Sequence, residues 1–364
     1  MSGAKYFSTL KGFVTLLYAI KRLATYNYPL NSDIYTLSSP PPLSSSPFSG
    51  LIAKDMAAVD QLIGQRLSSS VPLVGQVAQH IISSGGKRLR PVLLLLMAGA
   101  LGYKGDDHFK LAAVVEFIHT ATLLHDDVVD DSGMRRGKAT ANALFGNPAS
   151  VLVGDFLYSR AFQMMVECGE MRILDIVADA TNVIAEGEVM QLMNMHDASL
   201  DQQGYLKVIR SKTAKLFEAS TRLPAVLVKS SAKMEAACAA YGQALGTAFQ
   251  VIDDVLDYDG DAHTMGKNLG DDLREGKSTL PLIFAMQRGT LKQCELIKNA
   301  IEQGDIGALP DIAEIVRSTG AMQATRQAAS DEAQLALHAL ELLSASEYKT
   351  ALADIAEQLL DRQN

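Results

Sequence analysis

Leu123-Leu124-His125-Asp126-Asp127-Val128-Val129-Asp130-Asp131 is an acidic cluster inside an otherwise apolar, helix-like stretch. Asp126 and Asp130 are four residues apart, so in a helix their carboxylates lie one above the other on one face. Two like charges at this spacing repel each other, and burying them is costly unless a cation lies between them. The spacing therefore predicts a site that binds a cation.

A second run, Gln250-Val251-Ile252-Asp253-Asp254-Val255-Leu256-Asp257, repeats the DDxxD spacing in another apolar stretch. One acidic run alone would usually be a solvated helix face. Because apolar residues flank both runs, we interpret them as two walls of one metal site. Carboxylate oxygens suit Mg²⁺, which shares its ligand shell with substrate phosphates. The absence of nearby cysteine or paired histidine disfavours zinc.

The composition is that of a compact globular protein. With 364 residues, 48% of them hydrophobic, the chain can bury a large core. Its formal net charge of −8 argues weakly against nucleic acid as the main partner. Three scattered cysteines, Cys168, Cys238 and Cys294, lack metal-ligand spacing and suit a reducing compartment without disulfides. No uncharged apolar run reaches about 18 residues, so we expect no membrane span.

Residues 1–50 differ in kind from residues 51–364. A basic, partly amphipathic beginning is followed by a Pro/Ser-rich stretch from Leu37 to Gly50, which cannot form a packed element. We expect this extension to be disordered and the folded domain to span residues 51–364. A targeting peptide or a membrane-surface helix is the alternative. Because arginine is scarce here, we favour an extension without a targeting or membrane role and folding that begins near Leu51. The expected location is then cytoplasmic, and it is mitochondrial if the extension is a targeting peptide.

From Leu51 onward, apolar residues recur every three or four positions, as amphipathic helices require. Pro91 is well placed in the first turn of a helix that Gly102 would end. Further long helices are expected over residues 150–168, 173–196, 205–223 and 234–257. Neither alternating runs nor hairpin signals are evident, so the sequence predicts an all-α fold.

Basic residues occur where a diphosphate would need them. Lys87, Arg88 and Arg90 lie in a glycine-containing turn before a predicted helix, whose N-terminus itself attracts anions. The further cations that alternate with the acidic runs are Arg135, Arg136, Lys212, Lys215, Lys267 and Lys277. Each alone would be a surface charge, but together they favour two diphosphate sites. The sequence offers no nucleophile with its base and no P-loop, so we expect diphosphate to be a leaving group.

From about Leu51 to Asn364 the chain resembles the trans-polyprenyl diphosphate synthases, most closely the bacterial octaprenyl diphosphate synthases of quinone side-chain synthesis. The motifs that carry this resemblance are Gly86–Pro91, His125–Asp130 with Arg135-Arg136-Gly137, Gly154-Asp155, Lys212-Thr213, and Gln250–Asp257 followed by Gly266-Lys267. DDxxD alone would be weak, because terpene cyclases also contain it. The family implies the isoprenoid synthase fold, a large bundle of antiparallel helices around a central cavity, and usually a homodimer.

The resemblance also implies roles for the matching residues. The diphosphate of isopentenyl diphosphate would be bound by Lys87, Arg90, His119 and Arg136. The Mg²⁺ ions on the allylic diphosphate would be bound by Asp126, Asp130 and Asp253. That allylic group would be contacted by Arg135, Lys212, Thr213, Gln250 and Lys267. The expected catalytic residues are Asp126, Asp127, Asp130, Lys212, Asp253, Asp254 and Lys267.

The turn beneath the first motif bears on product length. In a helix, Thr122 and Ala121 lie four and five residues before Asp126, about one turn of 5.4 Å beneath it. In this family, bulky aromatic residues at these positions stop growth early, so the small residues here predict a long tail. The pocket for the growing tail then needs a floor deeper in the bundle. Candidates for that floor are Phe162, Met164 and Met165, although each fits an ordinary core position equally well.

We therefore expect a prenyltransferase that elongates farnesyl diphosphate with isopentenyl diphosphate to an all-trans polyprenyl diphosphate of octaprenyl length. The nearest alternative is another length, from heptaprenyl to decaprenyl. A terpene cyclase would lack the isopentenyl site, and a regulatory subunit of a heteromeric synthase would typically have lost aspartates. Contact with a membrane is expected to be peripheral at most, for release of the product.

Overall fold

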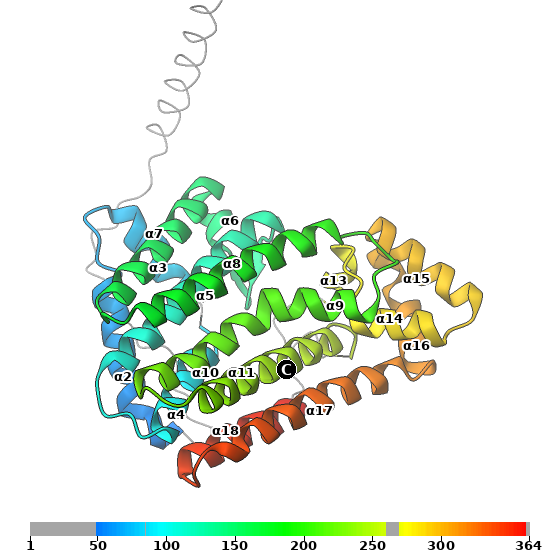
Figure 1. The fold of residues 1–364 in the computed structure, drawn as a ribbon. Coiled ribbons are helices and arrows are strands. Elements are labelled where there is room, and N and C mark those ends of the chain that lie inside the picture. Colours follow the sequence, from blue (N-terminus) through cyan, green and yellow to red (C-terminus); the bar gives the residue numbers. More distant parts are fainter. Residues whose placement is uncertain (1–48, 84, 260–268, 362–364) are drawn as a thin grey trace, which may run out of the picture. The chain divides into compact units, whose positions relative to one another are not determined.

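The computed structural model describes residues 49–83, 85–259 and 269–361 (Figure 1). Within these ranges the chain is almost entirely helical, which confirms the all-α prediction. The longer helices are α2 (Ser49–Arg66), α3 (Pro72–Ser83), α4 (Leu89–Ala100), α5 (Asp107–Val129), α7 (Asn147–Val166), α8 (Met171–Met193), α9 (Gln202–Ile209), α10 (Lys215–Leu227), α11 (Ala232–Asp259), α14 (Leu280–Arg288), α15 (Leu291–Gln303), α16 (Leu309–Ser318), α17 (Ala321–Ala339) and α18 (Glu347–Leu360). The short ones are α6 (Ala141–Phe145), η1 (Arg210–Ala214), α13 (Asp271–Arg274), η2 (Ile306–Ala308) and η3 (Leu340–Leu342).

A small β-ribbon follows α5, so the expectation of no hairpin is wrong at this point. Its strands, β1 (Met134–Arg135) and β2 (Lys138–Ala139), pair antiparallel. The two residues between them, Arg136 and Gly137, have positive φ angles of 52° and 73°. Positive φ at both central residues is the geometry of a two-residue type I′ turn. The ribbon therefore presents Arg136 at its tip, in a conformation that non-glycine residues rarely adopt.

Helix α4 begins two residues before Pro91, so the proline lies in the first turn as predicted. At the other end, Gly102 adopts a φ of 72°. The amides of Tyr103 and Gly102 donate hydrogen bonds to the carbonyl oxygens of Ala98 and Gly99, each 3.0 Å long. This is a Schellman cap, and it ends the helix where the glycine predicted.

The helices that carry the acidic motifs share a neighbour. Both α5 and α11 pack against α10, and α17 runs along α11 (Figure 1). The π-helical turn η1, which directly precedes α10, contacts both α8 and α11. The largest hydrophobic core surrounds these contacts and includes the fully buried Phe117, Phe217 and Tyr241. Helix α10 therefore contacts the helices of both acidic motifs, and η1 directly contacts the helix of the second motif.

None of the helices described by the structure is both long enough and apolar enough to cross a bilayer.

Candidate active site

The first acidic motif lies at the C-terminal end of α5. Asp126 is in the last turn, and Asp130 is the C-cap residue, whose amide donates a 2.8 Å hydrogen bond to the Asp126 carbonyl oxygen. The C-terminal end of a helix carries partial negative charge, so carboxylates gathered there favour a cation. Burial raises the pKa of Asp126, and the nearby Lys212 opposes that rise. The motif is therefore placed to receive positive charge.

The middle carboxylate of this motif, Asp127, has a different environment. Its side chain is fully buried, and Arg135 binds it with Nη2 at 2.7 Å and Nε at 2.9 Å from Oδ1. The amide of Asn142 donates a 3.0 Å hydrogen bond to the Asp127 carbonyl oxygen. The pair thus fixes the β-ribbon to α5. The catalytic role of Asp127 and the allylic role of Arg135 stay predictions.

Helix α8 contributes a residue that had no signal in the sequence. Glu188 Oε2 lies 2.6 Å from Lys212 Nζ. Burial raises the pKa of Glu188, and Asp126 adds to the rise while Lys212 opposes it. Burial raises the pKa of Tyr158 on α7 to about 12, with Asp126 and Glu188 contributing. A single glutamate on a long helix is usually a solvated surface charge, so the sequence alone does not single out Glu188.

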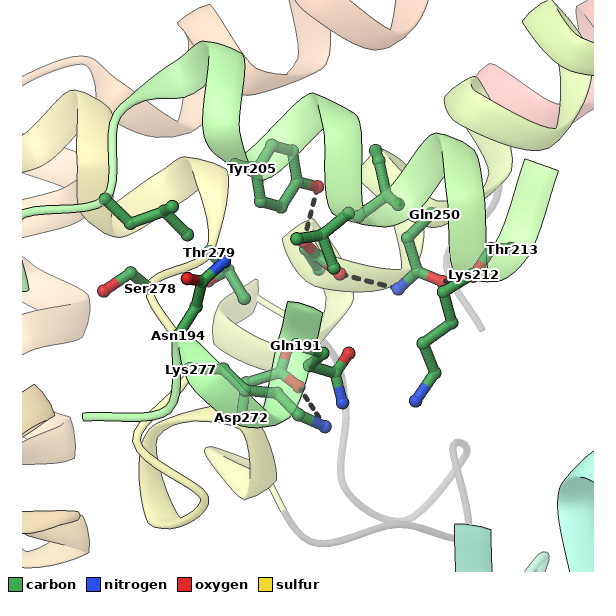
Figure 2. Close-up of a pocket in the computed structure, with 14 residues that line it drawn as sticks. Gln191, Asn194, Tyr205, Lys212, Thr213, Gln250, Asp272, Lys277, Ser278 and Thr279 are labelled. Carbon is green, nitrogen blue, oxygen red and sulfur yellow. Dashed lines mark hydrogen bonds and ion pairs between the residues drawn. The ribbon is translucent and has the colours of Figure 1, made fainter. Parts of the chain in front are cut away.

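The second acidic motif is held by neutral hydrogen-bond donors (Figure 2). The hydroxyl of Tyr205 donates a 2.6 Å hydrogen bond to Asp254, and the amide of Gln250 donates one of 2.8 Å to its other oxygen. Thr213 in turn donates a 3.0 Å hydrogen bond to the side-chain oxygen of Gln250. Burial raises the pKa of Asp254 well above its usual value. The structure therefore joins Thr213, Gln250 and Asp254, which the sequence assigned separately, and adds Tyr205.

A pocket of about 130 Å³ opens beside this network (Figure 2). Its wall includes Lys277, whose ammonium lies 3.9 Å from Asp272 and forms a closer ion pair with Glu275. Burial alone would lower the pKa of Lys277, but these carboxylates together raise it above its usual value. A cation therefore faces the pocket. Lys267, predicted to contact the allylic group, lies outside the described residues.

The predicted isopentenyl cluster gathers between α4, α5 and the β-ribbon. A Cβ built on Gly86 would lie 2.5 Å from Nη1 of Arg136, so this guanidinium rests directly against the turn that contains the exposed Lys87. Burial, with a smaller contribution from Arg136, lowers the pKa of Arg90 to about 10, and Glu116 and Asp253 oppose the fall. Burial, together with these arginines, holds the pKa of His119 well below its usual value. At neutral pH the cluster therefore combines charged guanidiniums with a neutral imidazole.

Glu116, three residues before His119 on α5, lies among these cations. Burial raises its pKa, and the neighbouring arginines oppose the rise. Within the described ranges, Glu116 Oε2 and Arg90 Nε are buried without a hydrogen-bond partner. Buried unpaired polar atoms are rare in proteins. Asp253 lies close enough to Arg90 to influence its pKa, so the cation cluster borders the second acidic motif.

The residues predicted to govern product length lie beneath the first motif. Ala121 is fully buried, and the hydroxyl of Thr122 donates a 2.8 Å hydrogen bond to the backbone one turn earlier. Met164 and Met165 are fully buried on α7, which packs along α5. Phe162 is 37% exposed, so its predicted place in the floor is wrong in this chain. The turn of α7 that buries the two methionines directs Phe162 outward.

Among the described residues, no three histidine, cysteine, aspartate or glutamate side chains converge closely enough to hold a metal ion by themselves. Mg²⁺ commonly binds through one or two carboxylates and takes its remaining ligands from water and substrate phosphates. Partly exposed carboxylates from both motifs, Asp126, Asp130 and Asp253, offer this kind of donor. The raised pKa of Asp126 at a helix C-terminus also favours a bound cation. The donor set therefore fits Mg²⁺ bound together with a diphosphate.

Comparison with known proteins agrees with this geometry. A family model described as polyprenyl synthetase matches residues 71–318. The chain is 51% identical over 313 residues to the octaprenyl diphosphate synthase of Escherichia coli (strain K12), covering 86% of this chain and 97% of that relative. It is 46% identical over 312 residues to the all-trans-nonaprenyl-diphosphate synthase (geranyl-diphosphate specific) of Rhodobacter capsulatus, covering 85% of this chain and 96% of that relative.

A solved structure, the polyprenyl synthase from Caulobacter crescentus CB15 complexed with calcium and isoprenyl diphosphate, superposes with a TM-score of 0.84 at 45% identity. The superposition covers 86% of this chain and 97% of that chain. The matches extend over both acidic motifs and the cation cluster described above. This chain belongs to the polyprenyl synthetase family and has its all-α isoprenoid synthase fold.

Proposed function

We propose that the chain is a Mg²⁺-dependent trans-prenyltransferase that elongates farnesyl diphosphate with successive isopentenyl diphosphates to octaprenyl diphosphate for a quinone side chain. The observation that carries the proposal is that two acidic motifs border two separate groups of cations. One group contains Arg90 and Arg136, and the other contains Lys212 and Lys277. An enzyme that joins two diphosphate substrates needs both groups, whereas a terpene cyclase needs only one.

The side chains suggest how each substrate is held. Arg90 and Arg136 would bind the diphosphate of isopentenyl diphosphate through charge-assisted hydrogen bonds, and the neutral His119 can donate another. Lys212 and Thr213 would bind the allylic diphosphate. Bound by the aspartates of the two motifs, Mg²⁺ would supply the charge neutralisation that a departing diphosphate requires.

The reaction balances without a protein nucleophile. The allylic carbon–oxygen bond breaks, and diphosphate leaves with the electron pair. The double bond of isopentenyl diphosphate then supplies the electrons for the new carbon–carbon bond. A proton leaves the isopentenyl unit, and the released diphosphate accepts it. The protein's part is to hold two diphosphates in register and to keep water from the allylic cation.

The octaprenyl length is supported by the small side chain of Ala121 beneath the first motif and by the similarity to the Escherichia coli octaprenyl diphosphate synthase. The Rhodobacter capsulatus relative is named for a nonaprenyl product and for geranyl diphosphate. Products from heptaprenyl to decaprenyl, and geranyl diphosphate as the starter, are therefore the alternatives.

One assay tests the proposal. The purified protein is incubated with Mg²⁺, labelled isopentenyl diphosphate and either farnesyl or geranyl diphosphate, and the products are sized by chromatography. We expect octaprenyl diphosphate from farnesyl diphosphate, and no product when EDTA removes the metal. A longer or shorter linear product would correct the length alone. A cyclic hydrocarbon, or no extension in any arm, would overturn the proposal.

We also propose a homodimer. Exposed apolar side chains follow one face of α7 at helical spacing, and others lie near the C-terminal end of α8: Leu152, Phe162, Val166, Val189, Leu192 and Met193. Exposed apolar side chains gathered on two helices that pack against each other favour a protein–protein contact. Sedimentation equilibrium should give twice the chain mass of 39.1 kDa. The cytoplasmic location, the domain boundary at residue 51 and the nature of residues 1–50 stay predictions.

A further inference from the structure

Lys212 and Thr213 lie on η1, the π-helical turn between α9 and α10. A π-turn contains one residue more than an α-helical turn, so it rotates the side chains that follow by about 100° around the helix axis. Such turns are rare and occur frequently at functional sites. The direction in which Lys212 and Thr213 point therefore depends on what keeps this turn in place.

Helix α8 holds the turn through two consecutive residues. A Cβ built on Gly187 would lie 2.6 Å from the amide nitrogen of Lys212 and 2.9 Å from the Cβ of Ser211. Real Cβ atoms essentially never approach another atom within 3.0 Å, so a larger residue at position 187 would push the turn away. The next residue, Glu188, binds the ammonium of Lys212 at 2.6 Å. Helix α8 thus contacts both the backbone and the side chain of Lys212.

Helix α11 holds the turn in the same way. A Cβ built on Gly246 would lie 2.7 Å from the Cα of Ala214 and 3.0 Å from its Cβ. One helical turn later, Gln250 accepts the 3.0 Å hydrogen bond from Thr213. Each neighbouring helix therefore supplies one glycine for close backbone approach and one polar side chain that binds Lys212 or Thr213.

We propose that Gly187 and Gly246 are positioning residues, which keep the π-turn in the geometry that presents Lys212 and Thr213 to the allylic diphosphate. The inference rests on the proposed function for the identity of that ligand. Neither glycine has a positive φ, so the fold uses their lack of a Cβ and not their backbone freedom. An added methyl group must displace the turn, and a displacement near 1 Å at a substrate-positioning group can cost about a hundredfold.

Isothermal titration calorimetry on Gly187→Ala tests the proposal. The probe is farnesyl diphosphate with Mg²⁺ and without isopentenyl diphosphate, so no elongation takes place. We expect the Kd of farnesyl diphosphate to rise by about tenfold or more. The Kd of isopentenyl diphosphate should change by less than about twofold, because its cluster lies on α4, α5 and the β-ribbon. Gly246→Ala should give the same pattern, and it serves if Gly187→Ala does not fold.

Two alanine variants provide matched controls. A Cβ on Gly99 would overlap the ring of Tyr348, so Gly99→Ala crowds the contact between α4 and α18 and not the contacts of Gly187 and Gly246 with η1. It should lower the melting temperature and leave both affinities unchanged. A Cβ on Gly75 meets no atom within 4 Å, so Gly75→Ala adds the methyl group without crowding.

Two results would overturn the inference. One is that Gly187→Ala and Gly246→Ala bind farnesyl diphosphate with a Kd within about twofold of wild type, because a displaced turn should weaken this binding directly. The other is a parallel loss of both ligands that follows the fall in melting temperature, since a general loss of structure would explain it. A wild-type protein that binds farnesyl diphosphate but never elongates it would contradict the proposed function and leave the positioning result standing.

Discussion

The two DDxxD motifs have the same spacing, but the fold uses their aspartates differently. In the first motif the two outer aspartates stay partly exposed, and only the middle one, Asp127, is buried. In the second motif the middle and last aspartates, Asp254 and Asp257, are both buried, and Asp253 is the member that stays partly exposed. The first motif therefore offers two carboxylates to a cation, and the second offers one.

The buried aspartates also have different partners. Asp127 is paired with a cation, Arg135, so the protein itself balances its charge. Asp254 receives hydrogen bonds from the neutral donors Tyr205 and Gln250, and burial raises its pKa. The middle aspartate of the same motif thus forms an ion pair in one wall. In the other wall it accepts hydrogen bonds from uncharged donors.

The largest expected effect is at an aspartate that is free to bind metal. Asp126→Ala removes a proposed Mg²⁺ ligand, so turnover should fall by about a thousandfold or more, on the order of 4 kcal/mol. Steady-state kinetics with labelled isopentenyl diphosphate measures it. Asp131→Asn is the matched control, because it removes an exposed charge close by and should have little effect. Turnover of Asp126→Ala within tenfold of wild type would remove Asp126 from the mechanism.

The turn beneath each motif provides the next contrast. Four residues before the first motif stands Thr122, preceded by the buried Ala121, whereas Phe249 occupies the same position before the second motif. Ala121→Phe should place an aromatic ring about one 5.4 Å turn beneath Asp126 and shorten the product to about the fifteen- to twenty-carbon range. Chromatographic sizing measures the change. An unchanged product distribution would show that the tail does not pass this turn.

A smaller effect is expected from the buried ion pair. Asp127→Asn leaves Arg135 without its counter-charge, so the free energy of unfolding should fall by about 3 kcal/mol. Urea denaturation measures this loss. Combining the change with Arg135→Gln should restore part of the stability, because the lone charge is then removed as well. If the double variant is no more stable than Asp127→Asn, the pair does not act as a unit.

Much of this arrangement was predictable, because it depends on local pattern. Helical periodicity predicted the all-α fold, and the basic stretches at Lys87 and Arg135 were visible as candidate diphosphate ligands, whereas the grouping of Arg90 with Arg136 came from the family resemblance. The β-ribbon escaped detection because its strands are two residues long, and Arg136-Gly137 is a weaker turn signal than Asn-Gly. Phe162 was misplaced because a single helix carries both buried and exposed apolar residues, and spacing alone does not identify the inner face.

The residues without any sequence signal act across large separations in the chain. Glu188 reaches Lys212 from another helix, and Tyr205 reaches Asp254 across 49 positions. The close approach of Gly187 to the π-turn depends on how α8 packs, which no local pattern encodes. The residues that meet the substrate are therefore easier to predict from one sequence than the residues that hold them in place.

The smallest expected effect concerns one of these supporting residues and tests whether the second motif depends on its network. Tyr205→Phe removes a hydrogen-bond donor from the buried Asp254, so the free energy of unfolding should fall by about 1 to 2 kcal/mol. Because Asp254 also orients Gln250, and Gln250 binds Thr213, we expect kcat/KM to fall by about threefold to tenfold as well.

Tyr241→Phe is the matched control, since the buried Tyr241 hydroxyl donates a 2.8 Å hydrogen bond to the Leu352 carbonyl oxygen in the helical core. It should lower stability by a similar amount and leave kcat/KM unchanged. Equal kinetic losses in the two variants would mean that the Tyr205 hydrogen bond only stabilises the fold. A loss confined to Tyr205→Phe would mean that the hydrogen bond from Tyr205 to Asp254 also keeps the second motif in the geometry that binds its ligand.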